Sequence, residues 1–250
     1  MPDQQPVPRF RQRAAKMSEL VARQILADIV EQGLSAGAAL PTEAQMVQGY
    51  GVSRGTLREA LRILETSGLV RVRPGRGGGP VVGSVDPHTF GRTMALFMQM
   101  GRTRFGELVE ARVIMEPLMA RLAAERRDAG RLRELAESMR EHRSLEERDE
   151  ASYLAVMQRF HGVLAGLSGN GVLDLFGRAL KEIYTERVVA AERRPERWEE
   201  VRREHEAVAA AIVAGDGAEA ERLMREHMVA LAAHLERDYA GVQDEVVGWW

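Results

Sequence analysis

The chain has 250 residues, 45% of them hydrophobic, and a formal net charge of −2 at pH 7, which is enough chain and enough apolar surface for two globular domains. It contains no cysteine and no apolar signal segment near its start, which counts against a disulfide framework, a thiolate metal site and export. No run approaches the length of a membrane span, so we expect a cytoplasmic protein.

The small net charge hides a difference between the two parts of the chain. Residues 1–83 carry 11 Lys and Arg against 7 Asp and Glu, a net charge of +4, whereas residues 84–250 carry 24 against 30, a net charge of −6. A basic front suits contact with phosphates, and an acidic remainder is repelled by them. The division indicates a nucleic-acid-binding domain followed by a body that stays away from the nucleic acid.

The chain opens with residues 1–17, which are rich in Pro, Gln and Arg. This composition predicts a flexible basic arm, either touching DNA backbone or without a role. From Ser18 onward, Val21, Ile25 and Ile29 recur at helical spacing and predict the first helix of a domain that extends to residue 83.

Two short helices and a tight turn are predicted between residues 40 and 68. Thr42 is a good N-cap, and Gln45 three residues later completes a capping box. Gly51 ends this helix, and Ser53 is a good N-cap for the next one. The arrangement is typical of a helix-turn-helix.

The second of these helices separates apolar from basic side chains. Its apolar positions recur at helical spacing, at Leu57, Ala60, Leu61 and Leu64. Arg54, Arg58 and Arg62 therefore share another face, and guanidinium groups on an exposed face suit phosphates and guanine edges. Arginines on an amphipathic helix also occur on ordinary solvated faces, so the DNA-binding interpretation depends on the cap, turn and stripe occurring in order.

A β-hairpin is predicted directly after this helix. Two valine-rich runs, at 69–73 and 79–82, are joined by Pro74-Gly75-Arg76-Gly77-Gly78. The hairpin therefore has a basic tip, and helix-turn-helix and hairpin together predict a winged-helix domain over residues 18–83.

The remaining sequence predicts an all-helical bundle. Residues 84–88 are a predicted linker and residues 241–250 a C-terminal tail, and no strand pattern occurs between them. Helical periodicity and Gly or Pro breaks predict seven helices, at 86–100, 103–125, 129–147, 150–168, 171–193, 195–214 and 217–240. The fold class is therefore mainly α, a winged helix followed by a seven-helix bundle.

The N-terminal motifs LPTE, GVSRGTLREALRILETSGLV and RPGRG resemble the winged-helix domain of the GntR family of bacterial transcription regulators. The resemblance implies DNA contacts at Ser53, Arg54, Thr56 and Arg58, with the wing contacting DNA near Gly75; we add Arg62 from the basic face and Arg76 from the basic tip. Ala44 and Gly55 depart from many family members, so the base preference of a relative does not transfer.

The helical part resembles the FCD effector-binding domain of the FadR-like branch of the same family. The resemblance rests on ELVEARVIMEPLMARLAAE at 107–125, FHGVLAGLSGN at 160–170 and EHEAVAAAIVAGDGAEAERLMREHM at 204–228. It implies that residues 89–240 dimerise and bind a small effector, often an organic acid, and that a metal ion is held among the helices in many members.

Three histidines, His161, His205 and His227, each lie on the apolar stripe of a different predicted helix. They could meet in the interior and hold a divalent metal, or each could be a hydrogen-bonded core histidine. The resemblance implies that they are the family's histidine ligands for zinc, nickel or manganese. The family's fourth ligand, an aspartate, is Met157 here, a neutral, soft thioether that binds such ions poorly.

Two further residues, Arg112 and Asn170, join Met157 as candidate effector contacts. Arg112 matches a family position that faces the effector cavity, where a planar guanidinium suits a carboxylate. Its alternative is an ion pair with Glu116 one helical turn later. The alternative for Asn170 is an ordinary residue at a helix end.

Together these features predict a ligand-responsive transcription regulator that is not an enzyme. We expect a homodimer on a palindromic operator in double-stranded DNA, with repression released by an organic acid or acyl effector. One alternative is a metal-dependent hydrolase fused to a DNA-binding head, although the sequence has no HExxH motif and no P-loop. The other is an architectural DNA binder without a sensing role.

Overall fold

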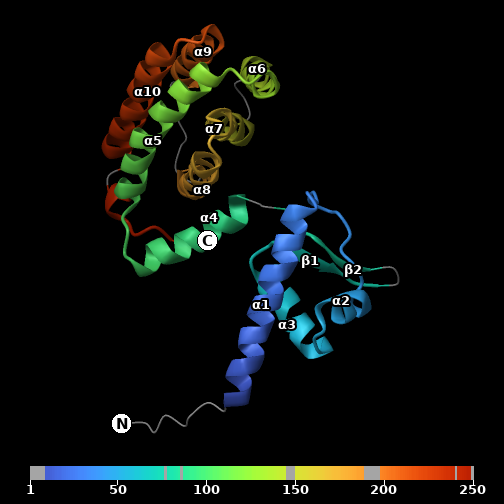
Figure 1. Cartoon of the computed structure of the whole chain (residues 1–250). Coiled ribbons are helices and arrows are strands. Elements are labelled where there is room, and N and C mark those ends of the chain that lie inside the picture. The colour runs from blue at the N-terminus through green and yellow to red at the C-terminus, as the bar shows by residue number, and fades with distance from the viewer. Residues whose placement is uncertain are drawn as a thin grey trace, which may run out of the picture. The chain divides into compact units, whose positions relative to one another are not determined.

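The computed structural model describes residues 9–75, 78–84, 87–144, 150–188, 198–239 and 241–248. The chain divides into two compact units, Met1–Thr89 and Phe90–Trp250. The described residues form ten α-helices, a two-stranded sheet and a short 3-10 helix (Figure 1). Among them, no helix has the length and apolar character that a membrane span requires.

The first unit is the predicted winged helix. It comprises α1 (Arg9–Glu31), α2 (Glu43–Tyr50), α3 (Arg54–Thr66), β1 (Val70–Arg73) and β2 (Gly79–Val82). The strands pair antiparallel, with Val70 opposite Val82 and Arg73 opposite Gly79. At Gly83, directly after the sheet, a Cβ atom would lie 1.9 Å from the carbonyl oxygen of Gly68, so the exit from the wing requires glycine.

The helix α1 begins earlier than the sequence analysis expects. Residues 9–17, assigned there to a flexible arm, belong to the helix, which starts at Arg9. After Pro8 the segment RFRQRAAK has no proline or glycine, and Arg, Gln, Ala and Lys are strong helix formers. The helix predicted from Ser18 onward can therefore extend toward the N-terminus as far as Arg9. Residues 1–8 lie outside the described part of the chain.

The caps predicted for the helix-turn-helix are present. Thr42 and Gln45 form the reciprocal capping box of α2, with Thr42 N donating to Gln45 Oε1 at 2.9 Å. Gly51 ends α2 at φ 62°, a left-handed conformation that costs glycine little. Ser53 caps α3, its Oγ accepting from Thr56 N at 3.1 Å. These caps fix where α3 begins and therefore which side chains it presents.

One apolar core holds the first unit together. The stripe of α3 is fully buried against α1 and β1, and the core consists of Val21, Ala22, Ile25, Ile29, Met46, Leu57, Ala60, Leu61, Leu64, Val70 and Val82. Burying such a stripe stabilises the helix by about 25 cal/mol for each Å² of apolar area removed from water. The opposite face of α3 is thereby fixed toward solvent.

The seven predicted helices follow, and apart from the first three residues of α4 they lie in the second unit. They are α4 (Pro87–Met100), α5 (Phe105–Arg126), α6 (Ala129–Ser144), α7 (Glu150–Leu167), α8 (Gly171–Val188), α9 (Trp198–Ala214) and α10 (Gly217–Asp238), followed by η2 (Val242–Asp244). Most ends agree with the sequence within two residues. The predicted segments 145–147, 189–193 and 195–197 lie outside the described residues.

The long helix α5 lies at the centre of this unit. It packs lengthwise against α10 (Figure 1) and also contacts α7, α8 and α9. Small side chains line its inner face, where Ala120, Ala123 and Ala124 are fully buried, so neighbouring helices approach closely. Side chains from α5, α7, α9 and α10 therefore meet in one interior region.

Candidate functional site

The exposed face of α3 carries three of the predicted DNA contacts, Arg54, Arg58 and Arg62, which are all exposed. Ser53 is exposed but also caps the helix, and Thr56 is half-buried with its Oγ1 2.9 Å from Ser53 Oγ. A basic helical face beside a wing is an arrangement that can enter a major groove and neutralise phosphates.

Two of these arginines have acidic neighbours. Arg58 Nε lies 3.2 Å from Glu43 Oε2 at the start of α2, and Arg62 Nη1 lies 3.9 Å from Glu59 Oε2. All four side chains are solvent-exposed, and such pairs contribute only about 0–1 kcal/mol. Both guanidinium groups can therefore exchange a carboxylate for a phosphate at low cost.

The wing places Gly75 at its exposed tip with φ 100°, a backbone conformation suited to glycine. Arg76, the basic residue predicted at that tip, lies outside the described residues. Gly55 on α3 has open space around it, because a Cβ atom there would meet Ser53 Oγ only at 3.8 Å. The packing of the fold therefore does not require glycine at position 55.

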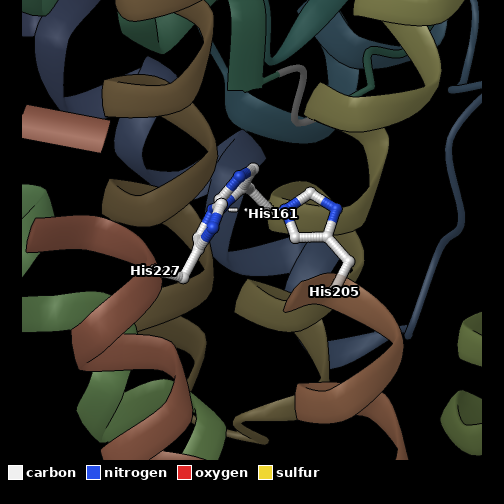
Figure 2. A group of neighbouring side chains, drawn as sticks. All are labelled: His161, His205 and His227. Carbon is white, nitrogen blue, oxygen red and sulfur yellow. Dashed lines mark hydrogen bonds between the residues drawn. The ribbon is translucent and has the colours of Figure 1, made fainter. Parts of the chain in front are cut away.

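Three imidazoles meet in the interior of the second unit. His161 comes from α7, His205 from α9 and His227 from α10, and each is buried. One ring nitrogen from each lies within 4.8 Å of the other two. Figure 2 shows the three side chains together. The convergence predicted from the three apolar stripes is confirmed; we call these three residues the histidine centre.

Two carboxylates determine which ring nitrogens are available at the histidine centre. Glu116 Oε2 lies 2.5 Å from His161 Nδ1, and Glu204 Oε2 lies 2.6 Å from His227 Nδ1. Because an ionised carboxylate only accepts hydrogen bonds, each Nδ1 carries the proton and donates it. The Nε2 atoms of His161 and His227 therefore keep their lone pairs, as in the carboxylate–histidine pairs of metal sites.

Burial controls the protonation of the histidine centre. Burial lowers the pKa of His161 to about 4, with Glu116 opposing the shift and Arg112 adding to it. Burial and the neighbouring imidazoles lower the pKa of His205 well below its usual value. Burial disfavours the ionised form of Glu116, but Arg112 and His161 outweigh burial and lower its pKa to about 2. At neutral pH the imidazoles of His161 and His205 are therefore neutral, the form that binds metal.

The donor set fits a divalent metal ion of intermediate softness. Zinc–nitrogen bonds of about 2.0–2.1 Å at a tetrahedral angle separate two nitrogens by roughly 3.3 Å, and His205 Nε2 and His227 Nε2 lie 3.2 Å apart. Both residues are buried. His161 would supply the third nitrogen, leaving further positions for water or a ligand atom.

Arg112 is buried next to this centre. Its Nε donates to Glu116 Oε1 at 2.6 Å, and its guanidinium carbon lies 4.3 Å from the centroid of the Tyr184 ring. Among the described residues, Nη1 and Nη2 have no hydrogen-bond partner although the side chain is 1% exposed. The sequence left an ion pair and an effector contact as alternatives; the ion pair is present, and it still leaves two amino groups for an anion.

The other two candidate effector residues differ in their surroundings. Met157 is buried on α7, one helical turn before His161. Asn170 is half-buried, and its Oδ1 accepts from Val172 N at 3.0 Å and Leu173 N at 3.3 Å. Asn170 therefore caps the start of α8, in agreement with a residue at a helix end, and its effector contact stays a prediction.

Sequence reasoning missed His142 on α6. The residue is 2% exposed, and its Nε2 lies 3.1 Å from His205 Nδ1. Its signal was present, because His142 follows Leu135 and Met139 at helical spacing and therefore lies on the buried stripe of α6. Glu204 gave no such signal, since its partner His227 is 23 residues away.

The chain matches two known protein families in succession. Residues 17–78 match the bacterial regulatory proteins of the gntR family, and residues 107–230 match the FCD domain. A solved structure described as Streptococcus agalactiae GntR aligns with a TM-score of 0.70 at 23% identity, covering 86% of this chain and 99% of that one. The overall fold is therefore shared with that protein.

Named relatives cover most of the chain. A protein of Escherichia coli K12, provisionally named as the L-lactate dehydrogenase operon regulatory protein, is 30% identical over 230 residues, 89% of this chain and 87% of its own length. The transcriptional regulator LutR of Bacillus subtilis strain 168 is 26% identical over 78% of this chain and 90% of its own. The transcriptional repressor NanR of Enterobacter sp. strain 638 is 28% identical over 87% and 85%, respectively.

Proposed function

The chain belongs to the gntR family of bacterial regulatory proteins and carries an FCD domain, and from this membership we propose how its DNA-binding head and its sensor divide the work of a transcription regulator. The protein is a ligand-responsive, DNA-binding regulator of transcription. Its first unit reads the operator, and its second unit binds the effector. The E. coli, B. subtilis and Enterobacter relatives are named as regulators and not as enzymes.

In the head, the operator is contacted from the start of α3 by Ser53, Arg54, Thr56 and Arg58. Arg62 contacts phosphates, and the wing contacts DNA through Gly75 and Arg76. The observation that supports this assignment is the exposed arginine face on a helix whose other face is fully buried. A single short helix reads only a few base pairs, so two heads of a homodimer bind a palindromic operator. Footprinting with a purified operator tests this, because a monomer protecting one half-site contradicts it.

In the sensor, the effector is a small organic acid held by Arg112. The observation that carries this proposal is a guanidinium group that is fully buried yet has two amino groups without a hydrogen-bond partner among the described residues. Leaving buried donors unsatisfied costs about 1–3 kcal/mol each, and a carboxylate would satisfy both in a bidentate pair. One relative is named for an L-lactate dehydrogenase operon, so L-lactate is the first acid to test.

The histidine centre holds a divalent ion such as zinc, nickel or manganese, which would supply Lewis acidity toward the effector carboxylate. His161, His205 and His227 bind it through nitrogen, while Glu116 and Glu204 orient two of these rings. Met157 occupies the position that the family resemblance assigns to an aspartate ligand, so the site lacks a hard anionic ligand, and we expect it to bind such ions less tightly than a site with that aspartate.

Effector binding changes operator affinity only if the acid binds one arrangement of the sensor better than another. We infer that the protein represses transcription and that the acid relieves this repression. The name of the repressor NanR supports this direction of regulation. Native mass spectrometry of the purified protein tests the sensor assignment. It should detect a dimer that carries a divalent ion and a small acid, and both should be lost from the variant Arg112→Met combined with His205→Ala.

A further inference from the structure

One imidazole of the histidine centre has two acceptors for a single proton. His205 Nδ1 lies 3.1 Å from His142 Nε2, and His205 Nε2 lies 3.2 Å from His227 Nε2. A neutral imidazole carries one N–H. His205 therefore donates either toward His142, through Nδ1, or toward His227, through Nε2.

His142 itself is fixed as an acceptor. Its Nδ1 lies 2.9 Å from the backbone carbonyl oxygen of Ser138, one turn earlier on α6. A carbonyl oxygen only accepts, so His142 Nδ1 carries the proton and His142 Nε2 offers a lone pair. The matching partner for that lone pair is an N–H on His205 Nδ1.

Packing alone does not decide where His205 keeps its proton. The ring of Phe160 stacks on the His205 ring with centroids 4.0 Å apart and planes at 18°, which sets the ring plane. A flip of the imidazole within that plane preserves the stack while exchanging nitrogen and carbon positions. The contacts with His142 and His227 fix the orientation of the ring, and whichever of the two accepts the proton fixes the tautomer.

We propose that His142 is a positioning residue for the metal ion: it draws the proton of His205 onto Nδ1 and thereby frees His205 Nε2 to join the Nε2 atoms of His161 and His227. All three lone pairs then point to one site. The inference rests on the metal-binding part of the proposed function, but the tautomer of His205 exists with or without a metal.

The role of His142 differs from that of the two carboxylates. Glu116 and Glu204 bring a negative charge to His161 and His227, whereas His142 brings a neutral acceptor to His205. Without His142, the remaining acceptor for the His205 proton in this cluster is His227 Nε2, and that proton would then lie between two nitrogens that the metal requires. Loss of such a partner typically weakens metal affinity by about 10- to 100-fold.

The test uses two variants that differ in one property. His142→Phe keeps a flat ring against Phe160 and removes the acceptor, whereas His142→Gln restores an acceptor oxygen. His234→Phe is the matched control, because His234 is also a buried histidine, with Nδ1 2.6 Å from Asp238 Oδ2 within α10. The full-length protein is labelled with ¹⁵N in histidine, and long-range ¹H–¹⁵N spectra of the metal-free form report the tautomer of each ring.

We expect His142→Phe to move the His205 proton from Nδ1 to Nε2 and to lower zinc affinity about 10- to 100-fold in competition with a chelator. We expect His142→Gln to restore both, and His234→Phe to change neither. An unchanged His205 tautomer in His142→Phe overturns the proposal, as does a His142→Gln variant as impaired as His142→Phe. If the tautomer moves as expected while the wild-type protein takes up no zinc, His142 still controls the tautomer of His205, but the metal-binding part of the proposed function fails and the role toward a metal fails with it.

Discussion

The buried pair of Arg112 and Glu116 offers a direct test of how the sensor is held together. Glu116 accepts from Arg112 Nε at 2.6 Å through one oxygen and from His161 Nδ1 at 2.5 Å through the other. Glu116→Gln keeps the shape of the side chain but removes its charge and one of its two acceptors. Arg112 then stays buried, 1% exposed, without a counter-charge.

The expected cost follows from these contacts. Removing one partner of a buried ion pair destabilises a protein by about 3–5 kcal/mol, because the remaining charge is uncompensated. A domain has roughly 5–15 kcal/mol of stability in total, so the loss is a large fraction of it. For a unit of this size, about 2–4 °C is lost per kcal/mol, so the sensor should melt ~6–20 °C lower.

The assay is urea unfolding of the full chain in the presence of a chelator, so that bound metal does not contribute. Glu125→Gln is the matched control: Glu125 is on the same helix and faces Arg121 at 3.5 Å, but both side chains are about half exposed. That change should cost less than about 1 kcal/mol. The double variant Arg112→Met with Glu116→Gln should be no less stable than either single variant, because no charge is then left buried alone.

The reasoning is refuted if Glu116→Gln unfolds within 1 kcal/mol of the wild-type protein at ~25 °C. It is also refuted if the two single losses simply add in the double variant, since the two residues would then act independently.

Three further predictions concern single positions. Arg54→Ala and Arg58→Ala should each weaken operator binding by about 1–3 kcal/mol in fluorescence anisotropy, with Arg140→Ala, an exposed arginine of the second unit, as the unaffected control; normal affinity in both variants contradicts the assignment of α3. Gly55→Ala should stabilise the head by up to about 1 kcal/mol in chemical denaturation, because its Cβ would meet nothing closer than 3.8 Å; destabilisation would show a constraint in α3 that the packing lacks. Met157→Asp should tighten zinc binding in calorimetry, whereas Met157→Leu should not, and equal affinities in all three proteins would remove Met157 from the site.

The fold was largely predictable because its signals are local. The capping box of Thr42 and Gln45, the cap at Ser53 and the stripe of α3 depend on residues three or four positions apart, and each is present. The boundary that differs is the start of α1, where prolines before Arg9 suggested an arm and good helix formers after it extended the helix. Local composition gave no clear sign of which tendency prevails.

The candidate site was predictable only in part, because most of its side-chain contacts are long-range. The apolar stripes identified His161, His205 and His227, since each stripe must face the common core. The bond between His142 and His205 joins residues 63 positions apart, and no spacing rule connects them. Similarly, the i, i+4 spacing suggested the Arg112–Glu116 pair, but not that Glu116 also binds His161 across 45 residues.

The central claim is that occupancy of the sensor interior changes DNA binding by the head. The most direct measurement is the affinity of the full-length protein for an operator selected from random duplex DNA, first after metal and bound acid are removed by chelation and dialysis, then after zinc and L-lactate or other short carboxylic acids are restored. The account predicts at least a tenfold change, about 1.4 kcal/mol of coupling, that reverses on restoration and disappears in Arg112→Met. The same operator affinity in every state, with native folding retained, would contradict it.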